Sequence, residues 1–244
     1  TADETARTVT SLLPRPEAHG GYFECLPAPS VRSQNPHMHL LEAFLAHARA
    51  RPGTDSLDRA EALVSLMRTR FLTTSPVWLR EVFAPDWGPA DGDRIETGHQ
   101  FEWAWLLSRF PGQARGGFDG AQQALYAAGN RLTGPNGEVW LSHGLDGEVL
   151  EANQRTWGLT EALKAHLAMA ETDAEATGRA VQTFDRLWSL HLAPAPEGGW
   201  IDRLGPTDEP ACGDMPASTL YHVVLAFADL TERAGVLSVA GPII

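Results

Sequence analysis

A histidine and a glutamate stand three residues apart in the segment GHQFEWAWLL, as His99 and Glu102. In a helix this spacing places both side chains on one face. A carboxylate beside an imidazole raises the basicity of the ring and selects its tautomer. Such a unit can remove a proton from a carbon next to a carbonyl group. The pattern therefore indicates either an acid–base site or a polar pair that caps a helix.

A second polar cluster, NPHMH, contains Asn35, His37 and His39. Asn35 and His39 lie one helical turn apart, which suits hydrogen bonding to sugar hydroxyls, with His39 pointing inward. Asn35 is also a good N-cap, followed by proline in the first helical position, and His37 is then expected to face water. The histidines of both clusters are possible zinc ligands. His37 and His39 point about 200° apart on a helix, so we predict no metal site.

His222 lies within a very apolar segment, ASTLYHVVLAFADL, that follows a long loop rich in Gly and Pro. A lone histidine on an apolar face is often a core residue. The preceding loop favours a functional role here, because site residues concentrate in such loops. Arg94 lies in another loop of this kind, where it can bind a sugar oxygen or be solvated.

Arg155, Trp157 and Glu161 begin a further apolar helix. The arginine can clamp a substrate, and the indole can stack on the C–H face of a sugar. Glu161 can bind the same substrate or be the buried partner of an arginine. Both interpretations of Glu161 remain open from the residues alone.

Helical periodicity dominates the chain. The predicted helices span residues 36–51, 56–71, 99–110, 117–133, 152–171, 173–191 and 217–234, and the first dozen residues read as the end of another. Short extended pieces are expected at 77–83, 138–142 and 199–204, within loops dense in Gly, Pro and Asp. No low-complexity linker divides the chain, so we predict a single all-α domain over residues 1–244.

The predicted helices fall into two kinds. The helix at 55–70 is amphipathic, which is typical of an outer helix with one wet face. Four others, beginning near residues 35, 98, 153 and 217, are apolar almost all round and polar only in their first two turns. We expect these to be inner helices of an α/α toroid with its polar groups at one mouth. Helix N-termini there would stabilise developing oxyanions.

Composition excludes several classes of function. Asp and Glu number 31 against 19 Lys and Arg, a net charge of −12 that disfavours nucleic acids and anionic membranes as partners. No apolar run approaches the roughly 20 residues needed to span a bilayer. The polar first residues do not resemble a signal peptide. Two cysteines without metal spacing fit a reduced compartment, so we expect a cytoplasmic protein.

Four segments together resemble the N-acylglucosamine 2-epimerase superfamily, which includes mannose isomerases and cellobiose epimerases. They are NPHMHLLEAFLA, ETGHQFEWAWLL, RTWGLTEALKA and MPASTLYHVVLA, in the expected order. The resemblance implies an (α/α)6 barrel that acts on a small-molecule sugar through an enediol, without a metal or organic cofactor. By the same resemblance, His99 and His222 are the catalytic residues. The implied substrate-binding residues are Asn35, His39, Arg94, Glu102, Trp157 and Glu161.

The run after the second histidine distinguishes branches of the superfamily. Epimerases tend to have an HVPR-like run there, whereas this chain has His222 followed by Val-Val-Leu. That pattern is similar to mannose isomerases, so we expect isomerisation of D-mannose to D-fructose or of a related sugar. The alternatives are a sugar 2-epimerase, a glycoside hydrolase with two carboxylates, and a sugar-binding module without turnover.

Seven helices and a partial one are too few for a toroid of six helix pairs. The first family motif in the chain belongs to the middle of the barrel, so the barrel is expected to be incomplete at the N-terminus. An open barrel would leave apolar helix flanks wet, at about 25 cal/mol for each Å². We therefore expect the sequence to be a fragment, or to be completed by a second chain.

Overall fold

The computed structural model describes residue 4 and residues 20–25, 29–111 and 120–233. The described part is mostly helical and divides into two compact units. Unit 1 comprises Thr1–Ile95 with Arg109–Gly112, and unit 2 comprises Glu96–Ser108 with Gln113–Ile244. Among the described helices, none combines the length and the apolar character needed to cross a membrane. The single domain over residues 1–244 stays a prediction.

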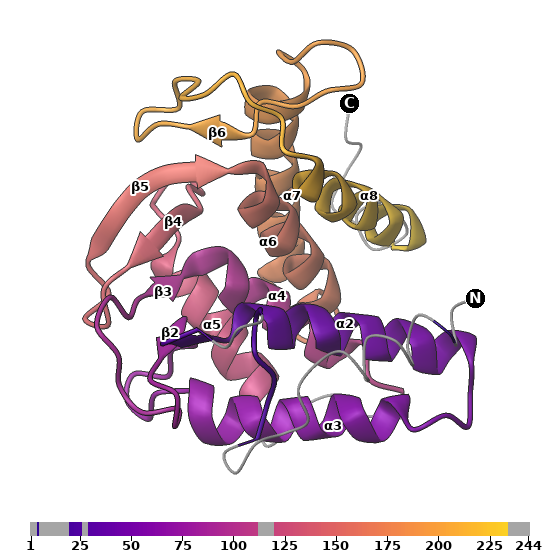
Figure 1. Ribbon diagram of the computed structural model, residues 1–244. Helices are drawn as coiled ribbons and strands as arrows, with labels where there is room; N and C mark the ends of the chain where they lie inside the picture. The colour runs from indigo at the N-terminus through magenta and orange to yellow at the C-terminus, as the bar shows by residue number, and fades with distance from the viewer. Residues whose placement is uncertain (1–3, 5–19, 26–28, 112–119, 234–244) are drawn as a thin grey trace. The chain divides into compact units, whose positions relative to one another are not determined.

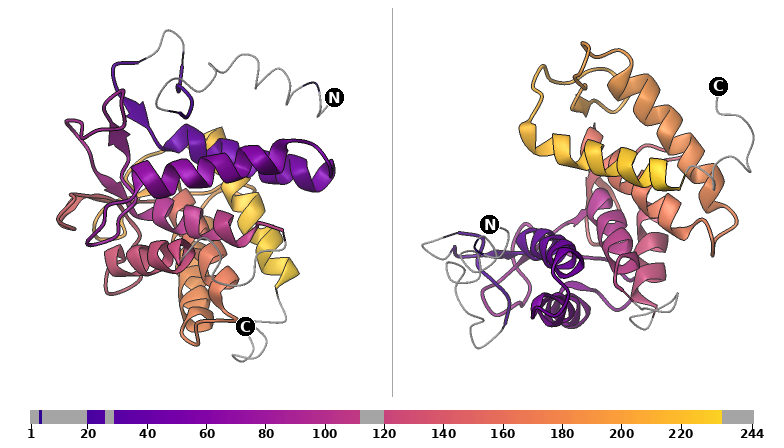
Figure 2. Two further views of the ribbon diagram at one scale, coloured as in Figure 1. Left: turned by 90° about the horizontal axis from the view of Figure 1, so that it is seen from below. Right: turned by 90° about the vertical axis from the view of Figure 1, so that its right-hand side faces the viewer.

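Unit 1 is built on a pair of helices that lie side by side (Figure 2). Its described elements include β1 (Arg32–Ser33), α2 (Asn35–Ala50), α3 (Ser56–Leu66), the π-helical turn η1 (Met67–Phe71) and β2 (Val82–Phe83). The two short strands pair in antiparallel fashion. The helix α2 packs on α3 and buries Met38, Leu41 and Leu45. Because Ala43 and Ala46 are exposed, α2 is amphipathic, whereas its sequence predicted a helix that is apolar almost all round.

The described residues of unit 2 form five α-helices, labelled in Figure 1. They are α4 (Thr97–Ser108), α5 (Ala121–Leu132), α6 (Thr156–Met169), α7 (Ala176–Arg186) continuing into η2 (Leu187–Leu192), and α8 (Ala217–Glu232). The helix α4 packs against α5 and α6, and α6 also packs against α7 and α8. Nearly every residue of α4 and α6 is buried, which agrees with their predicted place as inner helices. The helix α8 is less enclosed and exposes Leu220 and Val224.

A four-stranded sheet accompanies the helices of unit 2. Its strands are β3 (Ile95–Glu96), β4 (Trp140–His143), β5 (Val149–Arg155) and β6 (Arg203–Leu204), in the order β3-β4-β5-β6. The prediction of a helix beginning at residue 152 is wrong, because 152–155 belong to β5 and α6 begins at Thr156. Gln154 pairs with Trp140 and Leu204 on its two sides. These long-range pairings, rather than local periodicity, decide the conformation of the segment.

The fold is therefore mostly helical, as expected, with a small sheet that the all-α prediction did not include. The expected extended pieces at 138–142 and 199–204 contribute to β4 and β6. The closed barrel of six helix pairs and its N-terminal incompleteness stay predictions.

Candidate active site

The first turns of α4 and α6 lie in direct contact because both carry glycine. A Cβ placed on Gly98 would overlap the ring of Trp157 and lie 3.1 Å from the Cα of Gly158. A side chain larger than hydrogen at position 98 would push the two helices apart. The close approach brings His99, the next residue on α4, and Trp157 to the same end of unit 2.

The indole of Trp157 joins the two candidate histidines. Its ring centroid lies 4.8 Å from that of His99 and 5.8 Å from that of His222, at interplanar angles of 33° and 38°. The histidines are nearly buried, at 5% and 8% exposure. The structure thus places two imidazoles, one from α4 and one from α8, around one aromatic ring.

His222 is held by a buried carboxylate. Its Nδ1 lies 2.6 Å from Oε1 of Glu161, which is fully buried. Burial opposes ionisation of Glu161, but the charge of Lys164 and the hydrogen bond from His222 outweigh it and lower the pKa of the carboxyl group. An ionised Glu161 keeps the proton of a neutral His222 on Nδ1. The other ring nitrogen, Nε2, then carries the lone pair of the ring.

Glu161 is paired on its other side with Lys164, the only lysine of the chain. Its Nζ lies 2.8 Å from Oε2 of Glu161 and 3.6 Å from the centre of the Trp105 ring. Trp105 donates from Nε1 to Oδ2 of Asp229 at 2.6 Å. This buried network connects α6, α4 and α8. Sequence reasoning missed Lys164, although a charged residue three positions from Glu161 in an apolar helix was a usable signal.

Three side chains of unit 2 have the types and proximity of metal ligands. Glu102, Glu161 and His222 each offer an atom within 4.8 Å of the others. Both oxygens of Glu161 are already engaged, one by Lys164 and one by His222. A cation bound there would also lie near the buried ammonium group of Lys164, which would repel it. The donor set therefore suits proton transfer better than metal binding.

His99 has a carboxylate neighbour that sequence reasoning did not single out. Its Nδ1 lies 3.4 Å from Oε2 of Glu96, the last residue of β3. Glu102, the expected partner one turn further along α4, is fully buried. The available signal for Glu96 was its spacing of three residues on the N-terminal side of His99.

Both α4 and α6 begin with a threonine whose hydroxyl group contacts a histidine. The hydroxyl of Thr97 lies 3.2 Å from Nδ1 of His143, and the hydroxyl of Thr156 lies 2.9 Å from Nδ1 of His191. Burial lowers the pKa of both histidines, so both rings are neutral at pH 7. Their role is to position the helix starts that carry the site.

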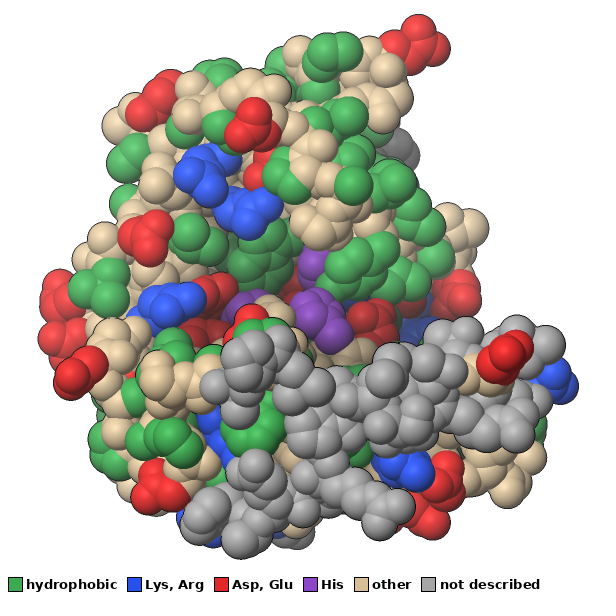
Figure 3. All heavy atoms as spheres, viewed as in Figure 1, with side chains coloured by type: hydrophobic (Ala, Val, Ile, Leu, Met, Phe, Trp, Pro, Cys, Tyr) green, Lys and Arg blue, Asp and Glu red, His purple; other side chains and the backbone are tan. Residues whose placement is uncertain are grey.

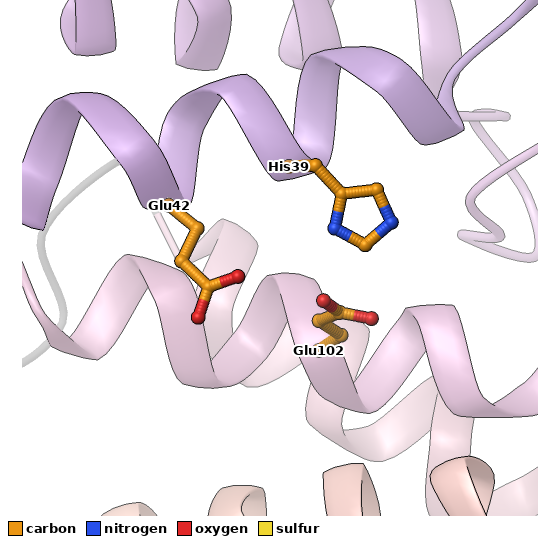
Figure 4. Close-up of side chains that lie close together, drawn as sticks. All are labelled: His39, Glu42 and Glu102. Atoms are coloured by element: carbon orange, nitrogen blue, oxygen red, sulfur yellow. The ribbon is translucent and has the colours of Figure 1, made fainter. Parts of the chain in front are cut away.

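Three of the predicted substrate-binding residues belong to unit 1. Asn35 is the first residue of α2 rather than its N-cap, one position away from the prediction. His39 and Glu42 project from the same side of α2 (Figure 4). Glu102, drawn in the same figure, belongs to unit 2. Arg94 is half-buried just before β3. The role of Asn35, His39 and Arg94 in binding a substrate stays a prediction.

His37 does not face water, so that prediction is wrong. The ring is fully buried in unit 1, with Nδ1 3.1 Å from the carbonyl oxygen of Ser33. Its Nε2 accepts a hydrogen bond from the backbone N–H of Tyr22 at 2.8 Å, and Trp87 packs edge-on against it. Burial lowers the pKa of His37 to about 4. A segment that precedes α2 covers this face of the helix, which its local pattern does not reveal.

Comparison with known proteins places these features in a family. Residues 2–226 match the family described as N-acylglucosamine 2-epimerase (GlcNAc 2-epimerase). The mannose-6-phosphate isomerase of Rhizobium meliloti (strain 1021) is 31% identical over 253 residues, which cover 95% of this chain and 62% of the relative.

Solved structures show the same fold. The crystal structure of D-mannose isomerase matches with a TM-score of 0.80 and 19% identity, covering 94% of this chain and 65% of that one. The cellobiose 2-epimerase from Spirochaeta thermophila DSM 6192 matches with a TM-score of 0.80 and 23% identity, covering 94% and 63%. This chain therefore spans less than two thirds of the length of these relatives. The match over residues 2–226 shows that the chain belongs to the N-acylglucosamine 2-epimerase family.

Proposed function

We propose that this chain carries the acid–base site of a sugar aldose–ketose isomerase. The observation that supports this most directly is the pair of imidazoles, His99 and His222, against Trp157, each with a carboxylate beside Nδ1. Imidazole is suited to moving a proton near neutral pH. The substrate is D-mannose or a close relative, and the relative named mannose-6-phosphate isomerase adds the phosphorylated sugar as a candidate.

The reaction starts from the open-chain aldose. One histidine removes the C2 proton, whose acidity comes from the adjacent aldehyde. The C–H electron pair becomes the C1–C2 double bond of an enediol, and the carbonyl oxygen O1 takes up a proton. Return of a proton to C1, with loss of the O2 proton, gives the ketose. Each acid–base group of this kind contributes about 10²–10⁴-fold in rate.

The same site accommodates a 2-epimerase, because the enediol is shared. Return of the proton to C2 from the opposite face would give the epimer, in agreement with the family description and with the relative named cellobiose 2-epimerase. A sugar-binding module without turnover is the third candidate. The products distinguish these three functions.

The experiment is incubation of the protein with mannose in D₂O, followed by NMR. We expect fructose with deuterium at C1. His99→Gln and His222→Gln should each lower the rate at least about 100-fold with unchanged helical circular dichroism. His47→Gln is the control, because His47 lies near the C-terminal end of α2 and its ring bonds to Ser56. Glucose with deuterium at C2 would identify an epimerase, and binding without exchange would identify a binding module.

We also propose that a complete barrel includes helices beyond those described. The greater length of the relatives supports this. The helices come either from the same polypeptide or from a second chain. Size-exclusion chromatography with light scattering tests the second case, and a stable monomer of these 244 residues with full activity would contradict both.

A further inference from the structure

Two arginines stand opposite each other where β5 and β6 pair. Arg155, the last residue of β5, is in antiparallel register with Arg203, the first residue of β6. Directly opposed side chains lie on one face of a sheet, with Cβ atoms about 4.5–5.5 Å apart. The neighbouring pair, Gln154 and Leu204, is buried on the other face. Basic side chains lie next to one another over this part of unit 2 (Figure 3). Like charges in this position repel unless an anion compensates them.

A single carboxylate compensates only one of the two charges. Oδ2 of Asp202 accepts a hydrogen bond from Nε of Arg155 at 2.9 Å and lies 2.7 Å from its Nη2. Oδ1 of Asp202 accepts a hydrogen bond from Thr219 at 2.6 Å. In the part of the chain that the structure describes, no carboxylate lies within ion-pair distance of Arg203, and its Nε is buried without a hydrogen-bond partner. One positive charge of the pair is therefore left over.

The arginine pair is connected to the residues around the two histidines through Trp157 and Asp202. Arg155 is the N-cap of α6 and stands two residues before Trp157, whose ring contacts both imidazoles. Asp202, the partner of Arg155, is bonded to Thr219, which lies on α8 about one helical turn before His222. The contacts therefore connect Arg155 to α6 and, through Asp202, to α8, two of the three helices that carry the site in unit 2. The positive end of α6 adds to the field around the pair.

We propose that Arg155 and Arg203 bind a phosphomonoester on the sugar, at the end remote from the reacting carbons. The inference rests on the proposed isomerase function and narrows its substrate class to aldose phosphates. Planar guanidinium groups present parallel N–H donors that match phosphate oxygens. A phosphate dianion compensates the charge of Arg203 and supplies an acceptor for its buried Nε. The open-chain sugar then extends from this subsite toward His99 and His222.

The test compares mannose 6-phosphate with mannose as substrates of the wild-type protein and of Arg203→Met. The measured quantity is the ratio of the two kcat/KM values. We expect the wild type to prefer the phosphorylated sugar, and the ratio to fall about 10- to 100-fold in Arg203→Met through loss of charge-assisted hydrogen bonds. Arg203→Lys keeps the charge but loses the planar fork, so its ratio should be intermediate. Arg49→Met, which removes the same charge from an exposed position on α2, is the matched control and should keep the wild-type ratio.

Arg203 is chosen because replacement of Arg155 would leave the buried carboxylate of Asp202 without its cation. Circular dichroism and thermal unfolding establish that each variant is folded. If Arg203→Met does not fold, Arg203→Lys decides the test. The proposal is overturned if the wild-type ratio of kcat/KM for mannose 6-phosphate over mannose is one or less. It is also overturned if this ratio is unchanged in both Arg203→Met and Arg203→Lys.

Calorimetric titration separates this proposal from the isomerase function. If neither sugar is isomerised, tighter binding of mannose 6-phosphate than of mannose, lost in Arg203→Met, would retain the anion subsite and refute only the isomerase. Equal binding of both sugars by the wild type would refute the subsite, whatever the turnover.

Discussion

Replacement of Lys164 by methionine removes the charge that faces Glu161 while keeping much of the side-chain volume. The lysine is fully buried, with Nζ 2.8 Å from the carboxylate and 3.6 Å from the centre of the Trp105 ring. Removal of one partner of a buried ion pair leaves an uncompensated charge and costs about 3–5 kcal/mol. We expect the free energy of unfolding to fall by about this amount at pH 7.

The size of this loss should depend on pH. Against the cost of burial, Lys164 and His222 lower the pKa of Glu161 below its ordinary value of 4.5. A carboxyl group with a lowered pKa stabilises the fold above its unfolded pKa, and this contribution disappears as the pH falls through the folded pKa. Lys164→Met weakens that contribution, so the difference from the wild type is largest at neutral pH and shrinks on acidification.

The assay is urea unfolding followed by circular dichroism at pH 7 and at about pH 4, where the usual carboxyl pKa lies. Glu161→Gln and the double variant complete a mutant cycle. Because the two side chains are in contact, the double variant should be more stable than additivity predicts, by about 0.5–3 kcal/mol. Arg49→Met controls for loss of a basic side chain at an exposed position. A loss below about 1 kcal/mol that is the same at both pH values would refute a stabilising buried pair, since exposed pairs contribute no more than that.

Three further outcomes are expected. Gly98→Ala should cost about 1–3 kcal/mol in urea unfolding, because its Cβ meets the ring of Trp157; an unchanged midpoint would contradict the close helix contact. The pKa of His37 is lowered to about 4 in the fold, so stability should decrease as the pH falls from about 6.5 to about 4, by up to about 3 kcal/mol. His37→Asn should lessen this slope, and an unaltered slope would show that another group causes it. Isomerase activity should survive dialysis against EDTA, and loss of activity that zinc restores would indicate a metal site instead.

The sequence by itself determined the elements that carry the site. Two of the four segments predicted to be apolar almost all round became α4 and α6, which are buried almost throughout. The other two became α2 and α8, which keep exposed faces. Helical periodicity placed His99, Trp157 and Glu161 in the first two turns of α4 and α6 and His222 in α8. Such features are readable because periodicity and polar helix starts are local properties of the chain. They led to the same family that the comparisons show.

Only the tertiary structure decided which side chains meet. It placed Lys164 behind Glu161 and Glu96 beside His99, and it buried His37 under a segment that precedes α2. It also turned 152–155 into a strand, because Gln154 pairs with residues 14 and 50 positions away, Trp140 and Leu204. Contacts of this kind depend on which elements pack together and on the free energy of burying charge beside its partner. Neither the packing of the elements nor the free energy of burying a charge is a property of a short stretch of sequence.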